Sequence, residues 1–91
     1  MELNKEEYKL NIINRLKKIE GQVKGIQRMV DDGKCCEDIM IQISAIRAAI
    51  NKVGGIMLDA YIKECLITSL KNDESDDRIN DLIETIVKYV K

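Results

Sequence analysis

Two stretches of this 91-residue chain carry apolar residues at alternating steps of four and three positions. The first set is Ile12, Leu16, Ile19, Val23, Ile26 and Val30, and the second is Ile39, Ile43, Ile46, Ile50, Val53, Met57 and Ala60. This spacing is the heptad pattern of a helix that packs lengthwise against another helix. It predicts one helix from a cap at Asn4 to about Asp32 and a second from about Cys35 to about Leu70.

Polar breaks separate the predicted helices. The first break covers residues 31–33 and ends in Gly33, which is suited to the left-handed conformation that follows many helices. The second covers residues 72–75, and Ser75 can cap a third helix with apolar residues between 79 and 90. The chain is therefore predicted to be all-α, with three helices.

Two pairs of glycines lie inside the predicted helices. Gly21 and Gly25 stand four residues apart, and each costs about 1 kcal/mol relative to alanine within a helix. We therefore expect another backbone to approach the first helix closely at this pair. Gly54 and Gly55 do not shift the phase of the apolar pattern, which predicts that the second helix is continuous or gently bent.

The composition is that of one small domain spanning residues 1–91, with no Pro, Trp, Phe or His. A chain of this length builds only a marginal core by itself, so we expect it to pack against further copies of itself. Two long helices joined by a short turn favour an antiparallel dimer built as a four-helix bundle. The third helix would cap this bundle or join two dimers into a tetramer.

The start of the chain, MELNKEEYKL, is charged and lacks the apolar stretch of a signal peptide. No run approaches the roughly 18 apolar residues of a membrane span. We therefore expect a cytoplasmic protein with no membrane partner.

Cys36 and Cys65 lie 29 residues apart on the second predicted helix. That separation is roughly 43 Å at about 1.5 Å per residue, so the two thiols cannot meet within one chain. If two such helices pair antiparallel about an axis near Ile50 and Asn51, residue i faces residue 101 − i. Cys36 of one chain then lies beside Cys65 of the other, and any chemistry that they share is intersubunit. The plain alternative is that each cysteine is a small core residue.

The residues around these thiols narrow their chemistry. Cys35 and Cys36 stand at the start of the second helix, where free N–H groups and the helix dipole favour a thiolate, although the two acidic residues that follow oppose this. Tyr61, one turn before Cys65, is a poor ligand for a soft cation. Because the chain has no His, a mixed Cys/His site is excluded. Two thiolates, or three with Cys35, remain able to hold Cu(I), whereas zinc would need four ligands.

Charge is distributed unevenly, although the net charge is only −1. Residues 9–28 carry six bases and one acid, whereas residues 66–91 carry four bases and six acids. Doubled in a symmetric assembly, the basic face of the first helix could contact DNA phosphates, although a solvated face is the commoner explanation. The sequence pI of about 5.5 does not favour DNA binding. The candidate DNA contacts on this helix are Arg15, Lys17, Lys18 and Lys24.

The stretch RLKKIEGQVKGIQRMVDDGKCCEDIMIQISAIRAAI, followed by Cys65 within YIKECL, resembles the copper-sensitive operon repressor family, also called CsoR/RcnR. The resemblance covers nearly the whole chain, and RLKKIEGQVKGI and DDGKxCxDIxxQISA are its most specific parts. It implies an all-α homotetramer, a dimer of antiparallel dimers, that represses transcription. Such a repressor binds operator DNA without a helix-turn-helix and releases it when the intersubunit site is occupied.

The resemblance also implies roles for single residues. Cys36 and Cys65 match the two family thiols, and Arg15 and Lys52 match basic positions that the copper branch uses for DNA. Tyr61 departs from the pattern, because copper and other metal sensors have His there. In this respect the chain is similar to the persulfide-sensing CstR branch, in which paired cysteines form disulfide or polysulfide links between protomers. Cys35 replaces the Tyr or Asp common at its position, and its role stays open.

The leading hypothesis from the sequence is a DNA-binding repressor, not an enzyme, that senses reactive sulfur species and requires no cofactor. A low-molecular-weight persulfide or other sulfane sulfur donor would modify Cys36 or Cys65, and crosslinking to the partner thiol would release operator double-stranded DNA. The alternative makes Cu(I) the inducer, held by Cys36 and Cys65 with or without Cys35. A thiol-transfer enzyme or metal carrier is less favoured, because the chain has no CxxC pair, and a pure assembly module would bind no DNA.

Overall fold

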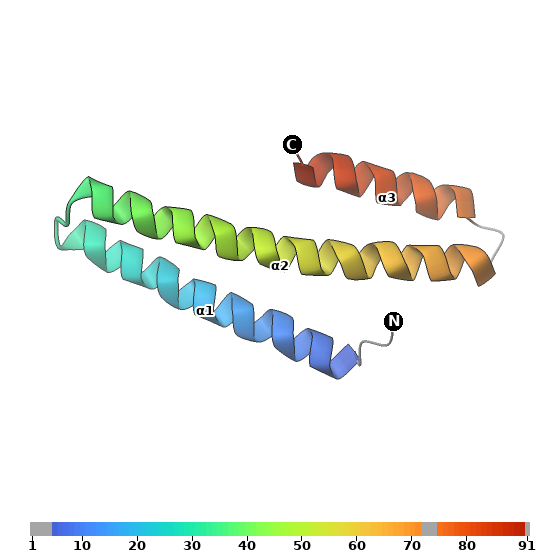
Figure 1. The fold of residues 1–91 in the computed structure, drawn as a ribbon, viewed down its shortest axis with the longest axis horizontal. Coiled ribbons are helices and arrows are strands. Elements are labelled where there is room, and N and C mark those ends of the chain that lie inside the picture. Colours follow the sequence, from blue (N-terminus) through green and yellow to red (C-terminus); the bar gives the residue numbers. More distant parts are fainter. Residues whose placement is uncertain (1–4, 72–74, 91) are drawn as a thin grey trace. The chain divides into compact units, whose positions relative to one another are not determined.

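The computed structural model describes residues 5–71 and 75–90, which form three α-helices (Figure 1). They are α1 (Lys5–Asp31), α2 (Cys36–Lys71) and α3 (Ser75–Val90), and the described residues contain no strand. The predicted all-α class and the three helices are confirmed. The expected cap at Asn4 and residues 72–74 of the second break lie outside the described residues.

The chain forms two compact units, Met1–Val53 and Gly54–Lys91, with the boundary inside α2. α2 itself is assigned as one helix of 36 residues, so it is continuous through Gly54 and Gly55 as the apolar pattern predicts. The expectation of a single domain over residues 1–91 stays a prediction. No helix in the described part of the chain is both long enough and apolar enough to cross a membrane.

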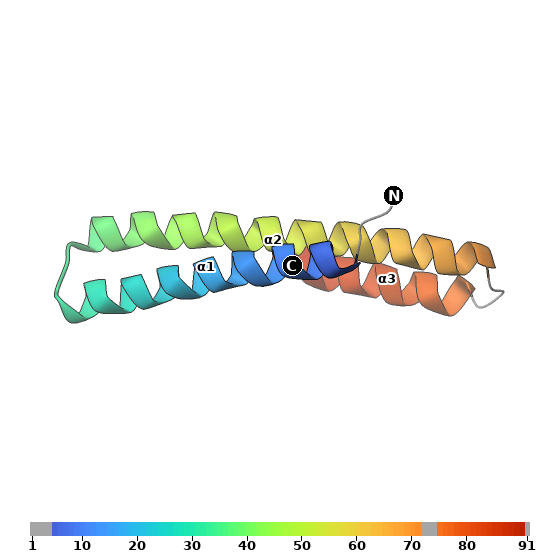
Figure 2. The ribbon, with the colours of Figure 1, turned by 90° about the horizontal axis from the view of Figure 1, so that it is seen from below.

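In the first unit, α1 and the first half of α2 form an antiparallel hairpin (Figures 1 and 2). The turn is closed by two hydrogen bonds of the Schellman type: the Lys34 N–H donates to the Met29 carbonyl at 2.9 Å, and the Gly33 N–H donates to the Val30 carbonyl at 3.1 Å. Gly33 has a φ of 70°, the left-handed conformation predicted for it. These bonds satisfy the last carbonyls of α1 and turn the chain into α2.

The heptad pattern of this hairpin divides into a covered stripe and an open stripe. Buried and partly buried positions recur every seven residues, at Ile12, Ile19 and Ile26 on α1 and at Ile39, Ile46 and Val53 on α2. The alternate positions are exposed, namely Leu16, Val23 and Val30 on α1 and Ile43 and Ile50 on α2. One chain therefore covers half of its own pattern and leaves the other half open to solvent.

In the second unit, α3 runs antiparallel beside the last part of α2 (Figures 1 and 2). Leu82 is buried and Ile86 is partly buried, and both lie within about 60° of Tyr89 around the helix. A neighbouring side of α3 is apolar but exposed, and it carries Ile79, Ile83, Val87 and Val90. α3 therefore also packs one apolar stripe and leaves another uncovered.

No described part of the single chain approaches Gly21 or Gly25 closely, so the predicted approach of another backbone stays a prediction for the assembly. A Cβ atom at either glycine would meet nothing within 4 Å in the described structure. The close approach occurs at Gly54 instead, where a Cβ would lie 2.8 Å from two ring carbons of Tyr89. Because such contacts are too short for a real Cβ, any larger residue at position 54 requires the Tyr89 ring to move.

Gly33→Ala is expected to lower the free energy of unfolding by about 1 kcal/mol, because it places a Cβ in the left-handed conformation. Gly33→Asn is the matched control, since Asn tolerates this conformation better, and it should cost clearly less. Urea unfolding followed by circular dichroism measures both variants. Equal stability of the Ala and Asn variants would show that the φ of Gly33 is not what selects glycine.

Candidate functional site

The structure places the three cysteines in two different settings. Cys36 is the first residue of α2 and Cys35 precedes it; both side chains are exposed and both thiols are free. The Cys35 carbonyl accepts a hydrogen bond from the Ile39 N–H at 3.2 Å, so its backbone already belongs to the start of the helix. Cys65, in the last two turns of α2, is also a free thiol but is only 1% exposed.

A single chain does not bring these thiols together. Cys36 and Cys65 belong to one continuous helix and are separated by eight of its turns. Within the described residues, no three Cys, Asp, Glu or His side chains gather in a way that could hold a metal ion. The described chain therefore carries one open thiol at the start of α2 and one covered thiol near its end.

Cys65 lies on the side of α2 that faces α3. Eleven residues separate it from Gly54, which is three turns of helix plus about 20°. Gly54 is the residue against which the Tyr89 ring of α3 lies. Tyr61, one turn before Cys65, is partly buried. Tyr61 and Cys65 therefore lie within about 40° of each other around α2.

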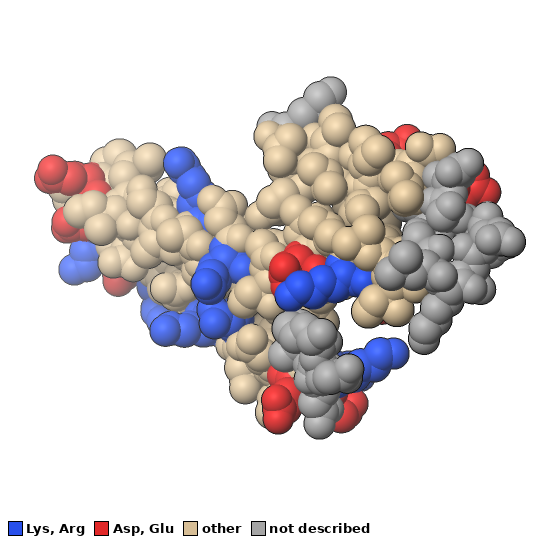
Figure 3. Space-filling model, turned by 45° about the vertical axis from the view of Figure 1, so that its right-hand side comes forward, with Lys and Arg blue, Asp and Glu red and all other residues tan. Residues whose placement is uncertain are grey.

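The candidate DNA-binding residues lie in the first unit, on α1 and on the part of α2 that packs with it. Figure 3 shows a group of adjacent Lys and Arg side chains on one face of the molecule, with most acidic side chains outside it. Arg15 is partly buried, and its Nε donates a hydrogen bond to Asn11 Oδ1 at 2.9 Å, which aligns its guanidinium along α1. The exposed members of the predicted set are Lys17, Lys18, Lys24 and Lys52.

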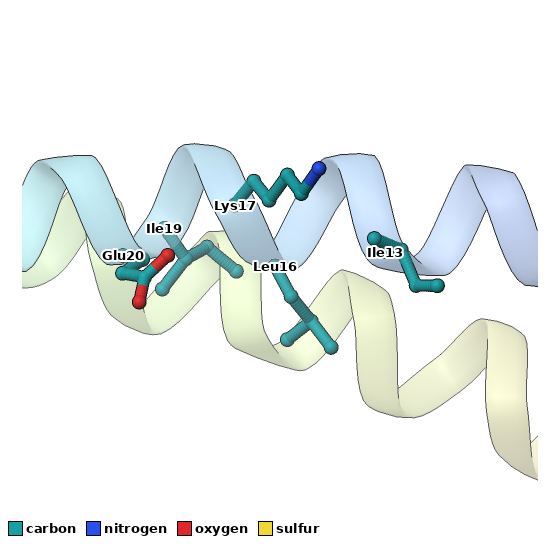
Figure 4. Close-up of a pocket in the computed structure, with 5 residues that line it drawn as sticks. All are labelled: Ile13, Leu16, Lys17, Ile19 and Glu20. Atoms are coloured by element: carbon teal, nitrogen blue, oxygen red, sulfur yellow. The ribbon is translucent and has the colours of Figure 1, made fainter.

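A hollow of about 380 Å³ lies along α1 (Figure 4). Ile13, Leu16 and Ile19 line it together with Lys17 and Glu20. The hollow includes a residue of the open heptad stripe, and its lining is mainly aliphatic. Because it lacks a set of converging polar groups, its chemistry suits helix packing better than the binding of a small polar ligand.

Sequence reasoning missed the difference in burial between Cys36 and Cys65. The pairing of residue i with residue 101 − i involved only the two long helices and treated the two thiols as equivalent. The missing signal was in the third helix, whose apolar positions are too numerous for one contact stripe and which therefore had to cover part of α2. The contact of Tyr89 with Gly54 was missed for the same reason.

Residues 8–88 match the family model described as metal-sensitive transcriptional repressor. A named relative is the copper-sensing transcriptional repressor CsoR of Bacillus subtilis (strain 168), which is 40% identical over 80 residues. That match covers 88% of this chain and 79% of the relative. The family inferred from the sequence motifs is thus supported by an independent comparison over most of the chain.

Two solved structures show the same fold. The copper-sensing repressor CsoR with Cu(I) from Geobacillus thermodenitrificans NG80-2 has a TM-score of 0.86 and 38% identity, and the match covers 100% of this chain and 94% of that one. The E64H variant of the formaldehyde-responsive regulator FrmR from Salmonella enterica serovar Typhimurium has a TM-score of 0.81 and 28% identity, with 91% and 94% covered. Regulators of one fold thus bear names that refer to different inducers, and the comparisons do not single out a persulfide-sensing branch.

Proposed function

The chain belongs to the metal-sensitive transcriptional repressor family, and from this premise we propose that it is an operator-binding repressor controlled by thiol chemistry between two protomers. The observation that carries the proposal is the placement of Cys36 and Cys65 at opposite ends of one uninterrupted helix. Two thiols arranged in this way act together only when a second chain supplies the missing half. The relatives are named as transcriptional regulators, which disfavours a thiol-transfer enzyme or a metal carrier.

The proposed assembly is an antiparallel dimer, with two dimers joined in a tetramer. Its support is the open heptad stripe, because Ile43 and Ile50 stay exposed in the single chain. Cys36 falls on the same stripe, seven residues before Ile43. Burying this stripe against a second α2 of opposite direction places Cys36 next to Cys65 of the partner helix and removes apolar surface from water.

Cu(I) is the inducer that the comparisons favour over the sulfur species placed first by sequence reasoning. The relatives at 40% and 38% identity are named as copper-sensing, and one structure is described with Cu(I). The donor set fits, since soft thiolates select Cu(I) and the chain offers no imidazole to complete a zinc site. Cu(I) held by Cys36 and Cys65 would tie the start of one α2 to the end of its partner.

Chains with Cys36→Ser and chains with Cys65→Ser should each lose tight Cu(I) binding, while the mixed dimer of the two should recover one site per dimer. This recovery is expected because the mixed dimer still pairs one intact Cys36 with one intact Cys65 across the interface. The measurement is an anaerobic Cu(I) titration against a strong Cu(I) chelator, with the two chains carrying different affinity tags.

The same titration in a Cys35→Ser background is the control, since it prevents the neighbouring thiol from replacing Cys36. A mixed dimer that binds no more Cu(I) than either parent would show that the site is not shared between protomers. Tight binding by the separate Cys36→Ser dimer, lost only in the Cys35→Ser background, would assign the ligand role to Cys35.

Persulfide sensing is the second candidate, and Tyr61 is the observation that favours it. Without a His ligand, the thiol pair can act as nucleophiles. One thiolate attacks the sulfane sulfur of a low-molecular-weight persulfide, which releases the small thiolate and leaves a cysteine persulfide. The partner thiolate then attacks the sulfur bonded to the cysteine carbon, expels hydrosulfide and closes an interprotomer disulfide. If the partner cysteine has also become a persulfide, its outer sulfur makes the same attack, expels hydrosulfide and closes a trisulfide.

Treatment of the metal-free protein with a low-molecular-weight persulfide should produce links between Cys36 and Cys65 of different chains if this second candidate is correct. Mass spectrometry of the unreduced digest identifies the link and its sulfur count, and the Cys65→Ser chain is the control. If the thiols stay unmodified while Cu(I) releases the DNA, copper alone is the inducer.

The proposed DNA surface is the basic face of α1 together with Lys52. Arg15→Ala and Lys52→Ala should each weaken DNA binding by about tenfold at low salt. A plot of the logarithm of the binding constant against the logarithm of the salt concentration should also become less steep. Its slope should fall by about one for every phosphate that the variant no longer neutralises. The probe is double-stranded DNA selected from a random pool by the unaltered protein, and fluorescence anisotropy gives the Kd.

Lys34→Ala removes the same charge from the exposed α1–α2 turn and is the matched control. It should leave DNA binding within about twofold of the unaltered protein, because Lys34 stands in the turn and is not part of the proposed DNA surface. Unchanged binding in both the Arg15 and Lys52 variants, with unchanged circular dichroism, would remove the DNA assignment.

A further inference from the structure

The contact between α2 and α3 fixes which of their residues lie opposite each other. The Tyr89 ring lies against Gly54, and the two helices run antiparallel in the second unit (Figures 1 and 2). Seven residues make two turns less about 20°, so Leu82 lies on the same side of α3 as Tyr89 and faces α2 near Tyr61. Leu82 is only 8% exposed, which confirms that this side of α3 is packed.

The same register brings Cys65 beneath the first half of α3. Its neighbours in sequence, Glu64 and Leu66, are both exposed. This part of α2 is therefore not buried all round, and by the register from Gly54 the covered Cys65 lies on the side of α2 that faces α3. An inducer in solution meets open thiols at Cys35 and Cys36, but a covered one at Cys65.

Little of the apolar surface of α3 is buried. Among the α3 side chains that the structure describes, Leu82 alone is buried. The neighbouring apolar side of α3, which carries Ile79, Ile83, Val87 and Val90, is exposed, with Val90 reaching 72%. An isolated helix of 16 residues is marginal in water. Elements with few buried contacts open at low free-energy cost compared with global unfolding.

We infer that α3 is a lid over the Cys65 thiol, so that an inducer engages the open thiols at the start of one α2 first and joins Cys65 of the partner only when that chain's α3 moves. The order of engagement rests on the proposed function, whereas the lid itself does not. Its place over Cys65 makes α3 the element whose position changes with occupancy of the shared site.

The test is the rate at which N-ethylmaleimide modifies each cysteine in the full-length, metal-free protein, measured by quenching and peptide mass spectrometry. Cys65 should react at least about 100-fold more slowly than in urea, and Leu82→Ala should raise its rate about tenfold or more through easier opening of α3. Ile83→Ala is the matched control. Ile83 follows Leu82 directly but is exposed, so its replacement should leave the modification rate of Cys65 unchanged.

A second matched pair serves if the Leu82 variant loses its helical circular dichroism. Gly54→Ala forces the Tyr89 ring away and should raise the Cys65 rate, whereas Gly55→Ala meets nothing within 4 Å and should not. The lid is overturned if Cys65 reacts as fast in the native protein as in urea, or if the folded test variant reacts no faster than its matched control. No DNA or inducer is present, so this failure leaves the proposed function standing. Conversely, if neither Cu(I) nor a persulfide changed DNA binding through Cys36 and Cys65, the proposed function would be overturned and the lid would stand.

Discussion

The continuity of α2 is the constraint on which the rest of the molecule depends. α2 is one helix of 36 residues, and Cys36 and Cys65 stand about eight helical turns apart along it. Two adjacent glycines at its centre could have broken it, but the heptad phase and the helix both continue through them. The proposed sharing of the two thiols between protomers rests on this continuity.

The open heptad stripe is the feature that favours association with a second chain. Each exposed Ile or Leu of the stripe keeps apolar area in water, at roughly 25 cal/mol per Å² that association would recover. Cys36 belongs to this stripe by its seven-residue spacing from Ile43 and Ile50. The surface that favours association therefore also carries the open thiol. In the proposed dimer, packing and sensing share one face of α2, so occupancy of the site bears directly on how the helices pair.

Helix content, the all-α class and the left-handed Gly33 could be predicted because each depends on local spacing and backbone conformation. The role of glycine within helices could not be predicted in this way. Gly21 and Gly25 have the spacing of a close contact but meet no neighbour in the chain, whereas Gly54 makes one through Tyr89, 35 residues away in sequence. The burial of Cys65, which we infer to come from α3, is likewise a tertiary feature rather than a local one. The inducer could not be predicted from the local sequence pattern either. Tyr61 favours sulfur chemistry, whereas the names of the relatives favour copper.

Cys36 and the proposed DNA surface belong to the same helical hairpin. Cys36 begins the α2 segment whose covered stripe packs on α1, and the basic residues stand on the outer face of that same α1. In the proposed dimer, a shift at the start of α2 would act on α1 through the covered stripe, because a close-packed interior transmits a displacement rather than absorbing it. In the proposed dimer, drawing Cys36 toward the partner's Cys65 moves one hairpin against the other. Phosphate contacts on the two basic faces depend on the spacing between them, and they weaken when that spacing changes.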